Sequence, residues 1–173
     1  DENRTYELIE NMFRKLAECF TTRNIHIGMD EAYMLGKGKY LEKHGLKDKA
    51  EIIAEHLKRV LKIADTYGFN CEIWGDMYIN AAYGGIGGIY NHTKDESERV
   101  AKLVPRNLKL CYWDYFSTDA THYEKLIDKH RRLTDNVSFA GGIWTWTGYC
   151  PNNRYSIKIT EAAVKACMKK GIT

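Results

Sequence analysis

The chain has 173 residues, of which 44% are hydrophobic, 28% charged and 12% aromatic. This composition is typical of a globular domain and excludes disordered, collagen-like and small disulfide-rich proteins. The net charge is only +3, with both signs interspersed, so nothing indicates nucleic-acid binding. No apolar run approaches the ~20 residues of a membrane span, and the polar start does not resemble a signal peptide. The sequence predicts one soluble domain over residues 1–173, with neither a nucleic-acid nor a membrane partner.

Five cysteines are scattered along the chain without a CxxC pair, which argues against a zinc or redox site. Cys71 and Cys111 lie in apolar, strand-like runs, where a free thiol behaves as a small hydrophobic side chain. We therefore expect mostly buried, unpaired thiols and a reducing, cytoplasmic location.

Helix-like and strand-like segments alternate in chain order. The first helical spacing of apolar residues covers 6–20, and a β-branched run at 24–28 predicts the first strand. Four strands separated by helices predict an α/β fold with a parallel sheet and no internal linker. The later predicted helices are 49–67, 94–104, 119–133 and 157–170, and the later strands are 69–77, 108–115 and 137–146.

Two architectures fit this alternation, an open doubly wound sheet and part of a (β/α)8 barrel. A doubly wound sheet gathers its site at one switch point, whereas a barrel uses every strand end around a ring. Candidate site residues lie at the carboxyl ends of all four predicted strands, after the first strand and on the other three, which favours the barrel. They are Asp30, Glu31, Trp74, Asp76, Tyr112, Asp114, Trp144 and Trp146.

The glycine-rich segment 83–90 lacks the features of a phosphate-binding loop. It does not join a strand to a helix with GxGxxG spacing, and it does not end in Gly-Lys-Ser/Thr. We interpret it as a mobile loop near the opening of the site, and the segment 36–39 as a solvated loop.

The strongest local signal is the segment 26–31, His-Ile-Gly-Met-Asp-Glu. Its adjacent carboxyl groups, Asp30 and Glu31, can occupy environments that keep one protonated and the other ionised, as acid–base catalysis requires. An adjacent carboxyl pair on an exposed loop would otherwise be a simple helix cap. The other strand ends favour the catalytic interpretation.

Aromatic and acidic residues recur at a spacing of two near these strand ends. Because residues two apart in a strand share a face, each such pair should point the same way. A cleft walled by indoles, with a phenol and carboxylates, suits a sugar ring, whose CH faces stack on aromatics while its hydroxyls need acceptors. The pairs are Trp74 with Asp76, Tyr112 with Asp114, and Trp144 with Trp146.

The segment 26–31 resembles the His-x-Gly-Gly-Asp-Glu signature of family 20 glycoside hydrolases, the retaining β-N-acetylhexosaminidases. Glu72-Ile73-Trp74, Tyr112-Trp113-Asp114 and Gly141-Gly142-Ile143-Trp144 are similar to later strands of that family, in the family's order, from Asn24 to about Tyr149. Met29 stands where the family usually has glycine, which we expect to be tolerated. Trp146 stands where many members have a glutamate that holds sugar hydroxyls.

The resemblance implies substrate-assisted hydrolysis of terminal β-linked N-acetylhexosamine residues in glycans, with no cofactor and no metal ion. It implies that Asp30 orients the substrate's 2-acetamido group, that Glu31 is the general acid and then the base, and that Tyr112 hydrogen-bonds the attacking oxygen. It implies that Trp74 and Trp144 line the acetamido pocket and that Asp114 binds a sugar hydroxyl. His26 would either contact substrate or, as we prefer, be buried and bonded to a neighbouring strand.

A complete barrel takes about 250 residues, so the resemblance implies that this chain corresponds to helix 3 through helix 7 of a larger catalytic barrel. By itself it would lack an arginine that the family supplies from earlier strands and would be inactive. We expect two open sheet edges and a face exposing Ile27 and Ile73, which predicts self-association.

Two other classes of function stay open from the residues alone. A carbohydrate-binding domain would use the same tryptophans without the acid, so its sugar affinity would survive loss of Glu31. A metal-dependent hydrolase could use His26, Asp30, Asp76 and Asp114 as ligands, although this spacing matches no recognised ligand pattern.

Overall fold

The computed structural model describes residues 2–84 and 93–172. Four strands form one sheet: β1 Asn24–His26, β2 Asn70–Trp74, β3 Lys109–Trp113 and β4 Val137–Ala140. The described helices are α1 Asn3–Cys19, α2 Lys39–His44, α3 Lys49–Thr66, α4 Asp76–Tyr83, α5 Ser97–Ala101, α6 Ala120–Arg131 and α7 Asn153–Lys170. The predicted alternation of strands and helices is confirmed.

The strands are all parallel and follow one another across the sheet in the order β1-β2-β3-β4. The register pairs Ile25 with Cys71, Ile73 with Leu110, and Cys111 with Ser138. A doubly wound sheet would reverse its strand order at a switch point, whereas a barrel adds each strand beside the last. The sequential order is therefore that of a partial (β/α)8 arrangement, and the predicted fold class is confirmed.

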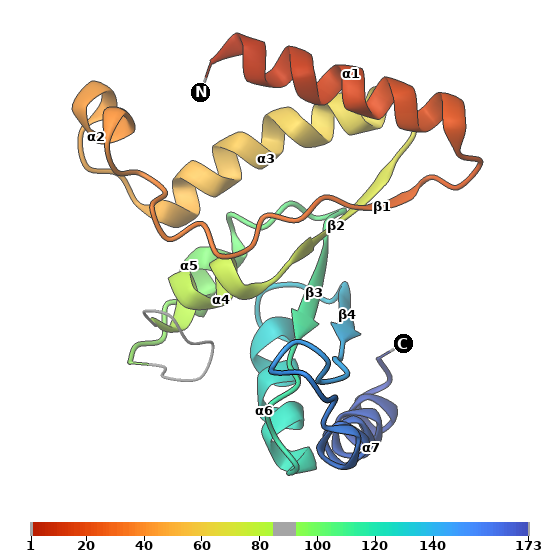
Figure 1. Cartoon of the computed structure of the whole chain (residues 1–173). Coiled ribbons are helices and arrows are strands. Elements are labelled where there is room, and N and C mark those ends of the chain that lie inside the picture. Colours follow the sequence, from red (N-terminus) through yellow and green to blue (C-terminus); the bar gives the residue numbers. More distant parts are fainter. Residues whose placement is uncertain (1, 85–92, 173) are drawn as a thin grey trace.

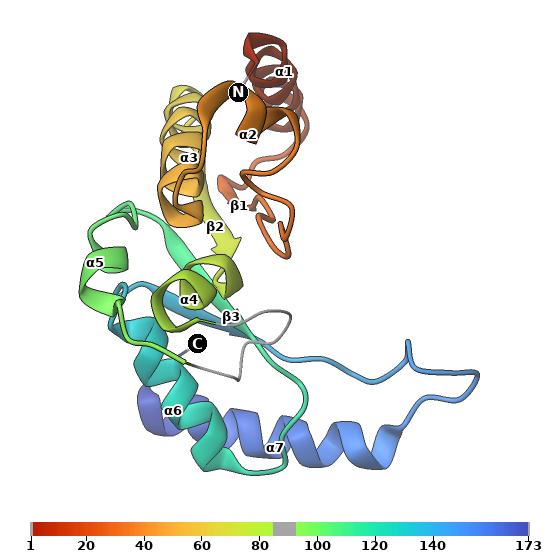
Figure 2. The ribbon, with the colours of Figure 1, turned by 90° about the vertical axis from the view of Figure 1, so that its left-hand side faces the viewer.

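Helices cover one face of this sheet in two groups (Figure 1). Helix α1 packs on α3 and α3 on β2, while α6 packs on α7 and on strands β3 and β4. Figure 2, turned by 90°, shows α1 and α3 at one end of the molecule and α6 and α7 at the other, with the segment between β4 and α7 projecting outwards.

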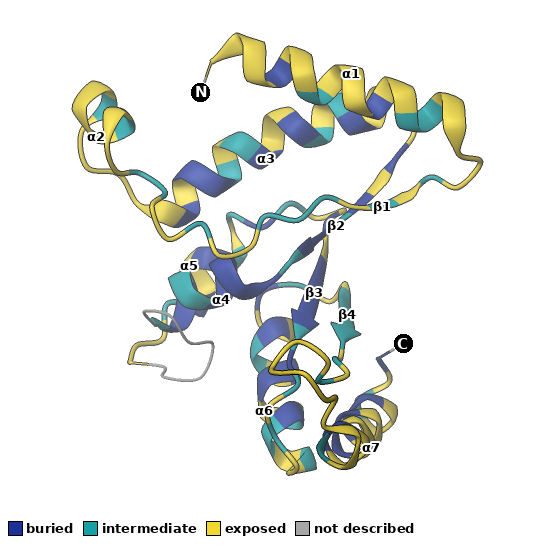
Figure 3. Cartoon of the chain, in the orientation of Figure 1, coloured by how far each residue is buried: buried dark blue, intermediate teal, exposed yellow. Residues whose placement is uncertain are grey.

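The core follows the same division into two clusters (Figure 3). The larger one gathers the buried face of α3 with Ile73 of β2 and Leu110 of β3. The smaller one joins Tyr112 of β3 to α6 and α7, where Ala162, Ala163 and Ala166 let the two helices approach closely. Side chains alternate along a strand, so Glu72, Trp74 and Trp113 project from the opposite sheet face.

The prediction that the barrel-facing side exposes large aliphatic residues is wrong. Ile73 is only 1% exposed and belongs to the larger core cluster, and Ile27 is half-buried against that cluster. The other face carries the Glu72 carboxylate, which contacts the Ser138 hydroxyl, beside the half-buried rings of Trp74 and Trp113. Self-association through the edge strands β1 and β4 stays a prediction.

Three differences from the predicted element boundaries bear on the site and its surroundings. Strand β2 ends at Trp74, because Gly75 turns the chain into α4 at Asp76. Strand β4 ends at Ala140, before the two glycines of the following loop. The short helix α2 was not predicted and begins at Lys39, where a loop was expected. The predicted glycine-rich loop 83–90 lies, beyond Gly84, outside the described residues.

The cysteines are all unpaired, as predicted, and Cys71, Cys111 and Cys167 are buried. Burial raises the pKa of the Cys71 and Cys111 thiols to about 11, so both are inert at neutral pH. Cys19 and Cys150 are exposed, so three of the five thiols are buried, in agreement with the expectation that most are. Across 2–84 and 93–172, the structure contains no helix with the length and apolar character of a membrane span.

Candidate active site

A hollow of about 330 Å³ opens at the carboxyl ends of the strands. Barrel enzymes place their sites at this end of the sheet. Carboxylates, indoles and a phenol contribute to its lining, which consists of Asp30, Glu31, Trp74, Trp113, Tyr115, Ala140 and Gly141. Each of the four strands, or the loop that follows it, thus supplies a residue to one site, as the barrel interpretation predicts.

A larger hollow, of about 780 Å³, lies among α3, the start of β2 and the loop before β3. It is at the amino ends of the strands, away from the adjacent carboxyl pair. Its charged lining residues are long surface side chains such as Lys58, Lys62 and Arg106. The chemistry of the site therefore belongs to the smaller hollow.

The loop after β1 presents the carboxyl pair through an unusual backbone. Gly28, Met29 and Glu31 have φ values of +76°, +77° and +49°, in the left-handed region that costs a residue with a side chain about 1–2 kcal/mol. Met29 therefore occupies a conformation that glycine adopts freely. Non-glycine residues held in this region concentrate at functional sites.

Hydrogen bonds from two neighbouring elements hold this loop. The Trp74 amide donates to the Gly28 carbonyl at 3.0 Å, which ties the loop to the end of β2. The Glu31 amide donates to Oδ2 of Asp76 at 3.0 Å. The side chains of Asp30 and Glu31 remain exposed at the hollow, so the backbone is fixed while both carboxyl groups are accessible.

Tyr33 lies beside the proposed acid, a placement that sequence reasoning missed. Its hydroxyl donates to Oε1 of Glu31 at 3.0 Å. Partial burial and this bond to a carboxylate raise the pKa of Tyr33, so the phenol stays protonated. Tyr33 stands two residues after Glu31, and a tight turn brings its side chain beside the Glu31 carboxylate. In this turn the Tyr33 amide donates to the Glu31 carbonyl at 2.7 Å.

Aromatic rings form one wall of the hollow. The rings of Trp113 and Tyr115 stack with centroids 5.7 Å apart, and Trp146 meets Tyr115 edge-on at 4.9 Å. Trp144 stacks on Trp146 at 5.3 Å and donates its indole N–H to the Tyr115 carbonyl at 2.7 Å. Desolvation, followed by the negative charges of Glu31 and Asp114, raises the pKa of Tyr115. The Tyr115 phenol is therefore a neutral donor close to the acid.

Trp144 and Trp146 share a side, as predicted, but neither is on a strand. Both follow Gly141 and Gly142, on the loop between β4 and α7, and Trp146 is 53% exposed. Both contact Tyr115, and neither lines the hollow itself.

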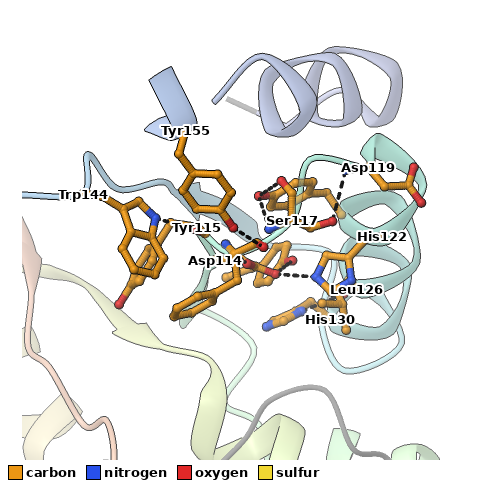
Figure 4. A network of polar contacts seen from close by, with 12 residues as sticks. Asp114, Tyr115, Ser117, Asp119, His122, Leu126, His130, Trp144 and Tyr155 are labelled. Carbon is orange, nitrogen blue, oxygen red and sulfur yellow. Dashed lines mark hydrogen bonds and ion pairs between the residues drawn. The ribbon is translucent and has the colours of Figure 1, made fainter. Parts of the chain in front are cut away.

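Tyr112 and Asp114 lie together but on the wrong side of β3 for the predicted roles. Tyr112 is 1% and Asp114 0% exposed. The Tyr112 hydroxyl donates to Oδ2 of Asp114 at 2.6 Å. Nε2 of His122 lies 2.7 Å from the same oxygen (Figure 4). Neither residue lines the hollow, because the alternation of β3 turns them towards α6 and turns Trp113 and Tyr115 towards the site. Tyr112 and Asp114 were predicted to contact substrate, but their side chains are enclosed on the helix side of the sheet.

Asp76 does not share a strand face with Trp74, contrary to the prediction. It is the first residue of α4, 4% exposed, and does not line the hollow. Burial and the nearby Asp30 raise the pKa of Asp76, while hydrogen bonds, chiefly from the Glu31 amide, oppose this rise. Asp76 therefore acts on the site from beneath the loop that carries Glu31.

His26 is exposed and bonded to its own loop, which corrects the expectation of a buried histidine bonded to a neighbouring strand. Its Nδ1 accepts a hydrogen bond from the Gly28 amide at 3.1 Å, and the centroids of the His26 and Trp74 rings lie 4.2 Å apart. Desolvation lowers the pKa of His26, with Glu72 and Asp30 opposing the change. His26 therefore helps to fix the Trp74 ring at the rim of the hollow.

The ligand set of the metal-dependent alternative is not brought together. Asp114 is enclosed by Tyr112 and His122 on the helix side of the sheet, whereas Asp30 is at the opposite face. Within 2–84 and 93–172, no cluster of three or more His, Cys, Asp or Glu side chains could hold an ion.

Comparison with known proteins finds likenesses among solved structures only. No protein-family model matches the chain, and no curated protein matches it. Among solved structures, it is similar to the GH20 beta-N-acetylhexosaminidase from Streptomyces coelicolor A3(2) at 18% identity and a TM-score of 0.44. The match covers 82% of this chain and 21% of that protein, so the chain spans about a fifth of its length.

Proposed function

We propose that this chain is the part from helix 3 through helix 7 of a glycoside hydrolase barrel that removes terminal β-linked N-acetylhexosamine residues from glycans. The observation that carries this proposal is the placement of Asp30 and Glu31 at the rim of a hollow walled by Trp74, Trp113 and Tyr115. Two accessible carboxyl groups beside stacked aromatic rings provide acid–base groups and a surface for a sugar face. The sequential order of the four strands supports a larger barrel as the complete unit.

The reaction we propose is substrate-assisted and retains configuration. The carbonyl oxygen of the substrate's 2-acetamido group forms a bond to the anomeric carbon as the glycosidic bond breaks, and Glu31 gives its proton to the departing oxygen. This step leaves a cyclic oxazolinium ion, whose positive charge the Asp30 carboxylate stabilises while accepting the acetamido N–H. Glu31 then takes a proton from water, which attacks the anomeric carbon and reopens the ring.

Tyr115, rather than Tyr112, provides the phenol in this proposal. Its neutral hydroxyl would donate to the acetamido oxygen as that oxygen attacks. Tyr115 lines the hollow and lies close enough to Glu31 for that charge to affect its pKa. The Tyr112 hydroxyl is already bonded to Asp114 on the far side of the sheet. Sugar hydroxyls are left to groups other than Asp114, because its carboxylate is enclosed.

The general-acid role is tested with Glu31→Gln in the complete protein. Alkyl or oligosaccharide β-N-acetylglucosaminides need leaving-group protonation, so their kcat should fall by about 10²–10⁴. A dinitrophenyl substrate does not need it and should lose much less. The control Glu161→Gln changes an exposed residue on α7 and should alter neither.

Equal losses on both substrates would reject Glu31 as the acid. Asp30→Asn should instead harm both substrate types, since stabilising the oxazolinium ion does not depend on the leaving group. A thiazoline analogue of the intermediate should inhibit the wild-type protein. Persistence of sugar affinity without any turnover would favour the carbohydrate-binding alternative.

A further inference from the structure

Asp76 is a buried carboxylate whose hydrogen bonding is incomplete. It is 4% exposed and comes from α4, 45 residues along the chain from the loop that it contacts. Oδ2 accepts the Glu31 amide at 3.0 Å, and the Trp113 side chain also interacts with this carboxyl group. Within the described residues, Oδ1 has no hydrogen-bond partner. Burying a carboxylate with one oxygen unpaired lowers the stability of the folded state. Stability alone therefore gives no reason for an aspartate at position 76.

Asp76 contacts the amide of a residue whose backbone conformation is unfavourable. Glu31 has a φ of +49°, and a non-glycine residue stays in that region only when its surroundings hold it there. The amide that Asp76 accepts is the amide of this residue, so the bond limits rotation about the N–Cα bond that directs the Glu31 side chain.

The start of α4 is a rigid support for this contact. The Gly75 amide donates to the Cys111 carbonyl of β3 at 2.9 Å, which fixes the helix start to the sheet. A Cβ at Gly75 would lie 2.8 Å from Nε2 of His130, so only glycine fits between α4 and α6. Asp76 follows directly, and its carboxylate is therefore held in a defined position beneath the loop.

We propose that Asp76 is a positioning residue for Glu31, which acts by accepting the Glu31 amide and so keeping the acid's carboxyl group directed at the leaving-group oxygen. This inference rests on the proposed function of Glu31 as the general acid. Asp76 itself contacts no substrate. The acceptor oxygen is the essential feature, and the negative charge is not.

The test compares Asp76→Ala, which removes the acceptor, with Asp76→Asn, which keeps an oxygen in place, in the complete protein. For an alkyl β-N-acetylglucosaminide we expect Asp76→Ala to lower kcat by roughly 10- to 100-fold, as misplacement by about 1 Å does, with KM changed less than about threefold. A dinitrophenyl substrate should lose less than about fivefold. Asp76→Asn should stay within about fivefold of wild type on both substrates.

A control separates positioning from general damage. Asp119→Ala removes a helix-capping carboxylate at the start of α6, where the Asp119 side chain accepts the Thr121 amide at 2.9 Å. It should alter stability without any dependence on the leaving group. Equal losses of Asp76→Ala on both substrates, or an Asp76→Asn loss as large as that of Asp76→Ala, would overturn the proposal.

Amide hydrogen exchange distinguishes this inference from the proposed function. The Glu31 amide should exchange at least about tenfold faster in Asp76→Ala than in wild type, and within about threefold in Asp76→Asn. If the wild-type protein hydrolyses no N-acetylhexosaminide, the proposed function fails, and faster exchange would still support the backbone contact. An unchanged exchange rate in Asp76→Ala would overturn the inference whether or not the protein is active.

Discussion

We expect the Tyr112 hydroxyl to stabilise the fold and the Tyr115 hydroxyl to act in catalysis, and Tyr→Phe substitutions at the two positions can test this. Tyr112→Phe removes the donor 2.6 Å from Oδ2 of Asp114, in a fully enclosed position. Asp114 keeps His122 at 2.7 Å and the Phe116 amide at 3.0 Å, so one of three bonds to a buried charged group is lost. A hydrogen bond to a charged group contributes about 1.5–3 kcal/mol, and we expect the free energy of unfolding to fall by that amount.

Tyr115→Phe should do the reverse. Its ring stays in the aromatic wall, so the free energy of unfolding should change by less than about 0.5 kcal/mol. Loss of a donor aimed at the reacting oxygen should lower kcat/KM by about 10²–10³. Urea denaturation and hydrolysis of an aryl β-N-acetylglucosaminide by the complete protein measure both effects. Loss of activity in a fully stable Tyr112→Phe protein, or wild-type activity in Tyr115→Phe, would refute the assignment of the two strand faces.

Three further outcomes follow from local geometry. Gly28 has a φ of +76°, and an added Cβ would meet no neighbouring atom nearer than 3.8 Å. Gly28→Ala should therefore lower the free energy of unfolding by about 1–2 kcal/mol through backbone strain alone. An unchanged denaturation midpoint would contradict this. A Cβ at Gly142 would lie 2.9 Å from both Trp146 and Tyr115, so Gly142→Ala should displace the aromatic wall and raise KM about tenfold, ~1.4 kcal/mol. Because the pKa of Asp76 is raised in the folded state, stability is lost as pH rises through that pKa. The stability advantage of Asp76→Asn over wild type should therefore grow from acidic to neutral pH, and a constant difference would contradict the raised pKa.

The alternation of elements could be predicted from sequence because most helices bury only one face. In α3 the buried residues include Ile53, Leu57, Val60 and Ala64, which repeat with helical spacing. Helix α4 lacks such a signal, since six of its eight residues are buried and no polar face interrupts the run. Its apolar stretch therefore resembled an extension of β2, and only Gly75 marked the break.

The candidate site could be predicted in part. The carboxyl pair and Trp74 line the hollow where the strand ends were expected to meet. The spacing in β3 correctly paired Tyr112 with Asp114, as their hydrogen bond shows. Alternation fixes which residues share a face but not which face points to the site, because both faces of this buried parallel strand carry apolar side chains. The same rule applied one residue later would have found Trp113 and Tyr115.

The central claim is that the substrate supplies its own nucleophile through the 2-acetamido group. The most direct measurement compares kcat/KM of the complete protein for an aryl β-N-acetylglucosaminide and for the matching aryl β-glucoside. A glucoside has a hydroxyl at that position and loses the intramolecular attack, so it should be hydrolysed at least about a thousandfold more slowly. Comparable turnover of the two substrates would contradict the proposed function of this site.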